Sequence, residues 1–178
     1  MQKPKFNQGH IIQEIVRVNH AGEYGAKMIY QGQIDNINSK KDREKINEMY
    51  EQELVHLKYF ENQLLVRRVR PTILMPIWHL GGYLLGRITA KLGAKQAMIC
   101  TDAVEEVIGQ HYEEQKLFLK KNISEKDLYN SITQFQAEEF QHQDIAQNAI
   151  GNINLKDRIL YGIINFICKI AILCSKKI

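Results

Sequence analysis

The fold is decided by residues 46–64, INEMYEQELVHLKYFENQL. Apolar residues recur there every three or four positions, which is the period of one face of an α-helix. Glu53 and His56 fall on this apolar face, between Met49 and Phe60. An ionised carboxylate in an apolar core is costly unless a positive group neutralises it, so the stretch predicts chemistry inside a helical core.

The same Glu-x-x-His pattern recurs in residues 128–149, LYNSITQFQAEEFQHQDIAQNA, where Glu139 and His142 lie on the apolar face. One such pair is readily explained as part of a buried salt bridge. Two identical pairs on core faces instead indicate a di-iron carboxylate bundle, in which each of two further helices contributes one more Glu.

Glu23 and Glu105 are the best candidates for these two further ligands. Glu23 lies on the apolar face of a helix expected over residues 9–34. Glu105 lies on the apolar face of a helix expected over residues 94–121. Its neighbour Glu106 shares a face with polar residues and is expected to be solvated.

The six predicted metal ligands are therefore Glu23, Glu53, His56, Glu105, Glu139 and His142. Each half of the chain places one Glu on its first helix and Glu-x-x-His on its second, which suits a pseudo-two-fold metal site. Four carboxylates and two imidazoles form an oxygen-rich ligand set that fits two iron ions, and manganese stays an alternative.

Helical periodicity predicts four long helices, over residues 9–34, 41–68, 94–121 and 124–149. Ser124 is a favourable N-cap for the last helix, and Gly151 is its stop signal. The second helix must end near Pro71. The predicted fold class is all-α, a ferritin-like four-helix bundle with two additional short apolar helical segments at a membrane interface.

These two apolar segments are residues 72–86 and 159–174, and the second lies in a C-terminal helix expected over about 155–176. Both are shorter than the ~20 residues that a membrane-spanning helix needs. Pro76 and Lys169 are also expected to interrupt them.

Two interpretations of the apolar segments stay open. One is a helix that covers the core or forms an oligomer contact. The other is a monotopic patch in the membrane interface, with Trp78 and Tyr83 at the depth of the lipid headgroups.

Composition narrows the class of protein. The chain has 178 residues, of which 44% are hydrophobic and 25% charged, and this predicts one globular domain over residues 1–178. The 24 basic and 20 acidic side chains leave a charge of only +4, so no nucleic-acid partner is expected. Three scattered cysteines without a CxxC pair argue against a disulfide scaffold or a structural zinc site. The N-terminal residues contain no apolar run, so no export signal is expected.

Four motifs resemble the demethoxyubiquinone hydroxylase family. They are RVNHAGEYGA at residues 17–26, ELVHL at 53–57, AVEE at 103–106 followed by His111-Tyr112, and EEFQHQDI at 138–145. The resemblance covers roughly residues 11–175, and all six ligand positions match. Asn19 stands where the family more often has Asp, but this is not a ligand position.

The resemblance implies an O₂-dependent di-iron monooxygenase of ubiquinone biosynthesis. The implied substrate is a 2-polyprenyl-3-methyl-6-methoxy-1,4-benzoquinone, whose ring is hydroxylated. Two iron ions, O₂ and an external reductant such as NADH are implied, and the chain has no GxGxxG dinucleotide motif of its own. For His111 and Tyr112 the resemblance implies electron or proton delivery. The alternative is a core Tyr beside a His that orients Glu105.

Two other functions stay open. One is a ferritin-like ferroxidase or iron-handling protein, and the other is a non-catalytic membrane-surface scaffold whose metal is structural. The apolar segments favour the hydroxylase over iron storage, because a lipid-tailed quinone needs an apolar surface. Expected partners are the polyprenyl quinone, a membrane surface, and a second copy or other ubiquinone-biosynthesis proteins. The expected location is peripheral, on the cytoplasmic face of a bacterial inner membrane, or on the matrix side of the mitochondrial inner membrane in a eukaryote.

Overall fold

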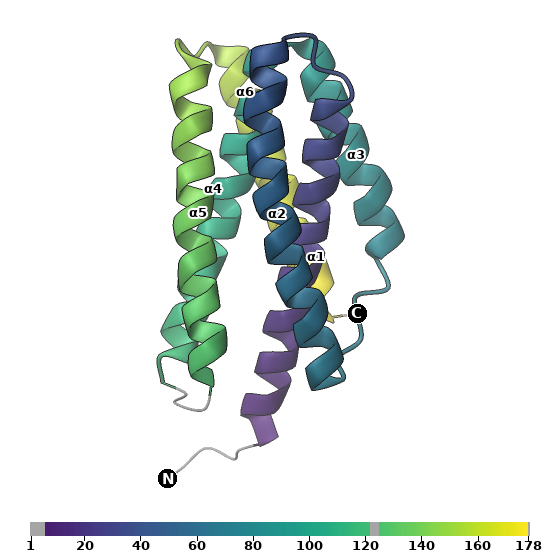
Figure 1. Cartoon of the computed structure of the whole chain (residues 1–178), viewed down its shortest axis with the longest axis vertical. Helices are drawn as coiled ribbons and strands as arrows, with labels where there is room; N and C mark the ends of the chain where they lie inside the picture. The colour runs from purple at the N-terminus through teal and green to yellow at the C-terminus, as the bar shows by residue number, and fades with distance from the viewer. Residues whose placement is uncertain (1–5, 122–124, 178) are drawn as a thin grey trace. The chain divides into compact units, whose positions relative to one another are not determined.

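The computed structural model describes residues 6–121 and 125–177, and these residues form helices joined by short connections (Figure 1). Within that part of the chain there is no strand, so the all-α prediction is confirmed. The helices are α1 (Phe6–Ile34), α2 (Lys40–Arg67), α3 (Met75–Leu92), α4 (Ala94–Leu119), α5 (Lys126–Ile150) and α6 (Leu155–Lys177). Helices α1, α2, α4 and α5 correspond to the four long helices that periodicity predicts.

Local chemistry sets the ends of these helices. The Asp42 N–H donates to the Ser39 side chain, which caps the start of α2. Arg68 adopts the left-handed conformation at φ 52°, so α2 ends at Arg67. Gly151, at φ 66°, ends α5 as predicted. The predicted N-cap of α5, Ser124, lies outside the described residues.

The chain divides into two compact units. The first unit comprises Met1–Ile88 and Ile170–Ile178, and in it α1 packs against α2. The second unit comprises Thr89–Lys169, and in it α4 packs against α5. The apolar faces of these helices are buried as their periodicity requires. One domain over residues 1–178 stays a prediction.

Helix α3 packs against α1 through glycines. A Cβ atom on Gly82 would lie 2.9 Å from the Gly25 carbonyl oxygen, and one on Gly86 would overlap the Ile29 carbonyl. The two glycines are one turn apart, so they line the face of α3 that lies against the α1 backbone. This is the small-residue packing that also joins helices in membranes.

Neither apolar segment is interrupted as the sequence predicted. Pro76 is the second residue of α3, where the helix does not need its N–H. Lys169 lies inside α6 without breaking it. By length and composition alone, Leu155–Lys176 is long and apolar enough to cross a membrane, with a mean hydropathy of 1.7. The prediction that this segment is too short to span was therefore wrong, although one such helix is weak evidence for a span.

Residues Asn154 and Asp157 fix the start of α6 within the second unit. The Asp157 N–H donates to Asn154 Oδ1, and the Asn154 N–H donates to Asp157 Oδ2, each at 3.0 Å. This reciprocal pair is a capping box. Lys95 Nζ of α4 lies 2.6 Å from Asp157 Oδ2, so the cap also ties α6 to α4.

Candidate metal centre

The first unit contains one buried cluster of possible metal ligands. Glu23 comes from α1, and Glu53 and His56 come from one face of α2, with exposed fractions of 0–1%. His56 Nδ1 lies 3.5 Å from Glu23 Oε2 and 4.0 Å from Glu53 Oε2. One ligand atom of each residue lies within 4.8 Å of the other two. These side chains could therefore hold a metal ion.

The second unit contains the same combination. Glu105 comes from α4, and Glu139 and His142 come from one face of α5, again with exposed fractions of 0–1%. His142 Nδ1 lies 3.3 Å from Glu139 Oε2. One ligand atom of each residue lies within 4.8 Å of the other two. The six residues predicted from the sequence thus form two groups of three, one group in each unit.

The donor chemistry of both clusters fits a metal ion. Each cluster offers two carboxylates and one imidazole, a hard ligand set that suits iron or manganese. Carboxylates removed from water need positive charge nearby, which a divalent cation supplies. Metal binding would explain why these polar residues lie on the apolar faces of their helices. That each of the six residues binds metal stays a prediction.

The environment of Glu106 differs from the prediction. Its Oε2 accepts hydrogen bonds from Tyr161 Oη at 2.6 Å and from Asn165 Nδ2 at 2.7 Å. Glu106 is only partly exposed, because α6 covers this side of α4. The predicted solvated face was therefore wrong here. Two polar residues one turn apart inside an otherwise apolar helix were the signal in the sequence.

Asp102, on the same side of α4, is also buried, with 7% of its surface exposed. Its Oδ1 accepts from Gln143 Nε2 at 3.0 Å and from Gln147 Nε2 at 2.9 Å. These two amides belong to α5, so a second neighbouring helix covers the face that was expected to be solvated. The contacts of these two glutamines with Asp102 were not predicted from the sequence.

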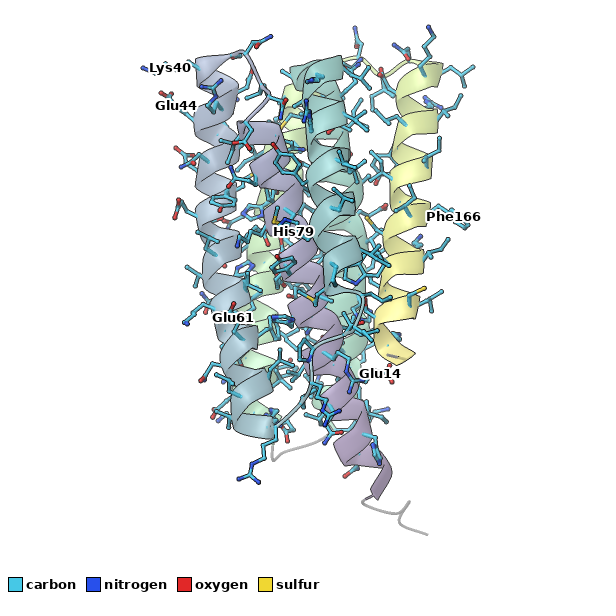
Figure 2. All side chains as sticks on the ribbon, turned by 90° about the vertical axis from the view of Figure 1, so that its right-hand side faces the viewer. Glu14, Lys40, Glu44, Glu61, His79 and Phe166 are labelled. Carbon is cyan, nitrogen blue, oxygen red and sulfur yellow. The ribbon has the colours of Figure 1, made fainter. Side chains whose placement is uncertain are left out.

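Beside the cluster of the first unit, His20 lies one turn before Glu23 and is 7% exposed. Burial lowers the pKa of His20, and the nearby carboxylates of Glu61 and Glu23 oppose this effect only in part. The neutral imidazole is therefore favoured. On the same helix, the Tyr24 hydroxyl lies 2.7 Å from Nδ1 of His79, which projects from α3 (Figure 2). No pattern in the sequence distinguishes His79 as a site residue.

His111 and Tyr112 occupy different environments on α4. Tyr112 is 1% exposed and belongs to the core. His111 Nδ1 lies 3.7 Å from Glu114 Oε2, whose carboxylate is largely exposed. A buried Tyr beside a partly buried His is compatible with both predicted roles, so electron or proton delivery stays a prediction.

Comparisons with known proteins identify a family and relatives that match most of this chain. The family model "Ubiquinone biosynthesis protein COQ7" matches residues 10–175. The human "NADPH-dependent 3-demethoxyubiquinone 3-hydroxylase, mitochondrial" is 40% identical over 169 residues, covering 94% of this chain and 78% of the human protein. The "3-demethoxyubiquinol 3-hydroxylase" of Rhodospirillum rubrum is 38% identical, covering 94% of this chain and 79% of that protein.

The yeast relative, from Saccharomyces cerevisiae, is named "5-demethoxyubiquinone hydroxylase, mitochondrial". It is 34% identical over 186 residues, covering 96% of this chain and 80% of the yeast protein. The relatives thus include bacterial and mitochondrial proteins, and all three are named as hydroxylases. The resemblance drawn from the four sequence motifs is confirmed, and the chain belongs to the ubiquinone biosynthesis protein COQ7 family.

Proposed function

We propose that this protein is an O₂-dependent monooxygenase that hydroxylates the ring of a demethoxyubiquinone-type polyprenyl benzoquinone. The observation that carries the proposal is the pair of buried Glu-Glu-His clusters, one in each unit. The names of the relatives support the same substrate and reaction class. A ferroxidase would use similar ligands, but it would act on iron rather than on the quinone that these names specify.

Two iron ions are the proposed metals. Glu23, Glu53 and His56 would hold iron in the first unit, and Glu105, Glu139 and His142 would hold iron in the second. When bound, the iron pair supplies the redox chemistry that activates O₂. The ligand set alone does not separate iron from manganese.

The chain's own residues perform three tasks in this proposal. The carboxylates balance the charge of the metals, and their burial excludes water from the reaction. The i, i+3 spacing of Glu53 and His56 keeps these two ligands on one rigid helical face. Neutral His20 adds no positive charge beside Glu23, which leaves that carboxylate available to a cation.

An external reductant is required, because hydroxylation by O₂ consumes two electrons beyond those of the substrate. We propose a nicotinamide cofactor as their source, as the name of the human relative includes NADPH. His111 and Tyr112 are the proposed route for electrons or protons along α4. Replacing Tyr112 with Phe should then slow product formation without changing metal content.

A peripheral membrane location is part of the proposal, because a polyprenyl tail is not soluble in water. We give the name proposed membrane surface to the exposed large apolar side chains of two segments, each of which is proposed to contact lipid. They are Ile73, Ile77, Leu80, Leu84, Ile88 and Leu92 of α3 and the residues before it, and Leu155, Ile159, Ile163, Phe166, Ile167, Ile170 and Leu173 of α6. Phe166 projects away from α6 (Figure 2). This apolar surface suits an interfacial helix.

The polar residues of α6 favour an interfacial position over a span. Asp157, Tyr161 and Asn165 all bind side chains of α4. One side of α6 is therefore occupied by protein, and its exposed apolar side is left for lipid. Tyr83, which was expected at headgroup depth, donates a hydrogen bond from its hydroxyl to Asp35, the residue after α1, at 3.0 Å. An inner-membrane location on the cytoplasmic or matrix side, and assembly with a second copy or other biosynthetic proteins, stay predictions.

A single-turnover experiment tests the proposed function. The iron-loaded protein is reduced without oxygen and then mixed with ¹⁸O₂ and a short-chain demethoxyquinone. The expected product is the hydroxylated ring with ¹⁸O from the gas. Oxidation and accumulation of iron with the quinone unchanged would instead support the ferroxidase. Bound metal with neither accumulation of oxidised iron nor hydroxylation of the quinone would instead support the non-catalytic scaffold with a structural metal.

A further inference from the structure

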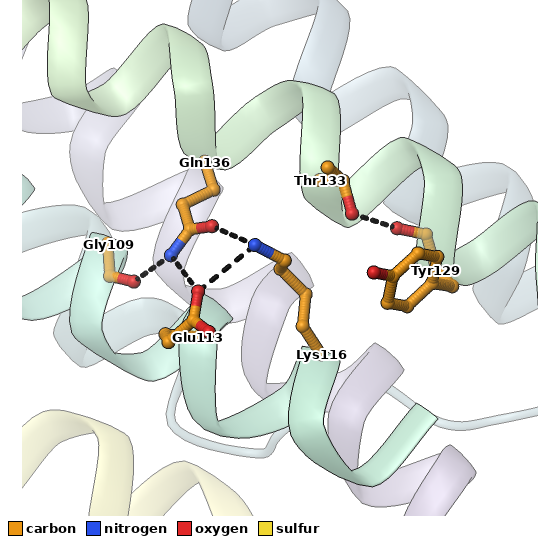
Figure 3. A network of polar contacts seen from close by, with 6 residues as sticks. All are labelled: Gly109, Glu113, Lys116, Tyr129, Thr133 and Gln136. Carbon is orange, nitrogen blue, oxygen red and sulfur yellow. Dashed lines mark hydrogen bonds and ion pairs between the residues drawn. The ribbon is translucent and has the colours of Figure 1, made fainter. Parts of the chain in front are cut away.

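Gln136 is a buried amide on α5, one turn before Glu139, with 4% of its surface exposed. A buried amide costs free energy unless its polar atoms are bonded. Its Nε2 donates to the Gly109 carbonyl at 2.8 Å and to Glu113 Oε2 at 3.1 Å, both on α4. Its Oε1 accepts from Lys116 Nζ at 2.6 Å (Figure 3). One side chain of α5 thus binds three positions along α4.

Lys116 and Glu113 also interact with each other, which completes this network. Lys116 Nζ lies 3.0 Å from Glu113 Oε2, one turn along α4. Hydrogen bonds from Lys116 and from Gln136 lower the pKa of the Glu113 carboxyl, which therefore stays ionised near neutral pH. Bonds to charged partners are stronger than bonds between neutral groups, so Gln136 is held firmly.

Gly109 brings the two helices close together beside the metal cluster. A Cβ atom added to Gly109 would lie 2.7 Å from Cε1 of Phe140, the residue that follows Glu139. That distance is too short for two carbon atoms in contact. A methyl group at Gly109 would therefore displace the Phe140 ring, which is 45% exposed.

A second set of bonds ties the same helices on the other side of the cluster. Gln143 and Gln147 of α5 donate to Asp102 of α4. On α4, Glu105 lies between Asp102 and Gly109 in the sequence. The ligands of α5 lie between Gln136 and Gln143, so glutamine bonds flank the cluster at both ends.

We propose that Gln136 is a positioning residue that sets the register of α5 against α4 and so brings Glu139 and His142 to Glu105 at metal-binding distances. This inference rests on the proposed function, because it requires that the cluster binds metal. An α-helix rises about 1.5 Å per residue, so a slide of one residue would separate these ligands by more than metal coordination tolerates.

The test replaces Gln136 with methionine in the full-length protein. Methionine keeps the length and volume of the side chain but removes its hydrogen bonds. Gln134→Met is the matched control, because Gln134 is exposed and donates to Glu138 within α5. Ferrous iron is titrated into each metal-free protein without oxygen, and thermal unfolding is followed with and without the metal.

Gln136→Met should weaken metal binding by about 10- to 100-fold and reduce the rise in Tm that iron produces. Gln134→Met should match the wild type in both measurements. Equal metal affinity of Gln136→Met and wild type, even with a lower Tm of the metal-free variant, would show a merely structural role and overturn the inference. If the wild type itself binds no iron, the proposed function fails first and this inference fails with it.

A second set of variants keeps the test decisive if Gln136→Met does not fold. Gly109→Ala should displace the Phe140 ring, which follows Glu139 on α5, and should weaken metal binding in the same way. Adding Phe140→Ala removes the opposing ring and should restore metal binding to Gly109→Ala. An unchanged affinity for iron in Gly109→Ala, or no recovery of this affinity in the double variant, would contradict the proposal that the register of α5 against α4 controls metal binding.

Discussion

The Tyr161 hydroxyl donates to the Glu106 carboxylate at 2.6 Å and joins α6 to α4 one residue beyond the ligand candidate Glu105. Asn165 donates to the same oxygen at 2.7 Å. A carboxylate that accepts two bonds on a partly covered surface is a specific attachment point for an otherwise apolar helix. Helix α6, which carries part of the proposed membrane surface, is therefore fastened beside the candidate metal cluster of the second unit.

Removing this attachment should loosen α6. Tyr161→Phe is expected to lower the free energy of unfolding by about 1–2 kcal/mol, because it deletes a hydrogen bond to a charged acceptor. Asn165→Asp should cost more, since it places a second carboxylate beside Glu106. Urea unfolding curves of the two variants measure both effects. Equal stability of all three proteins would mean that the bond to Glu106 does not hold α6.

The sequence predicted the long helices well because their apolar periodicity is strong and local. Glu105 was correctly expected on a buried face of α4. The error at Glu106 has a physical cause, since periodicity describes one helix and does not reveal which later helix covers its polar side. The end of α2 depended on Arg68 in a left-handed conformation that non-glycine residues rarely adopt. The role of Gln136 depends on contacts between helices, which no spacing within α5 could predict.

A methyl group at Gly86 should disrupt the packing of α3 on α1. Gly86→Ala is expected to destabilise the protein by about 1–3 kcal/mol, because its Cβ would overlap the Ile29 backbone. Gly81→Ala is the matched control on the same helix, where an added Cβ meets no atom within 4 Å. That control should be neutral or stabilising by up to about 1 kcal/mol. Thermal unfolding of both variants measures this difference in stability. Equal stability of the two variants would contradict the close packing of α3 against α1.

Asp157 should make stability depend on pH. The hydrogen bond from the Asn154 N–H, together with the Lys95 ammonium, lowers the pKa of Asp157 below that of the unfolded chain. At acidic pH the unfolded state then binds more protons than the folded state. The stabilisation by ionised Asp157 is therefore complete above the unfolded pKa of about 3.9. It is lost as the pH falls through the lower pKa of Asp157 in the folded protein. The difference in stability between wild type and Asp157→Asn should therefore shrink on acidification below pH ~4. A constant difference down to pH ~2 would contradict this linkage.

Charge on the proposed membrane surface should weaken lipid binding. Ile77→Glu and Phe166→Glu each place a carboxylate where a large apolar side chain is now exposed by 58% and 64%. Flotation with vesicles that contain anionic phospholipid should show reduced binding for both variants. Val55→Glu is the control, because Val55 is 63% exposed on α2, outside this surface. Full binding by the two variants, or equal loss by the control, would place the lipid contact elsewhere.

The sharpest prediction separates ligands from neighbouring carboxylates. Glu53→Ala and Glu139→Ala should abolish the binding of at least one iron ion, because each removes a buried oxygen donor from its cluster. Glu106→Ala should retain iron while losing the contact to α6, and Glu14→Ala should retain iron without loss of stability. Metal content of the purified variants, measured after anaerobic loading and desalting, distinguishes these outcomes. Loss of iron from Glu106→Ala together with its retention in Glu105→Ala would mean that the carboxylate bound by Tyr161 is the true ligand, and that α6 must release it before metal can bind.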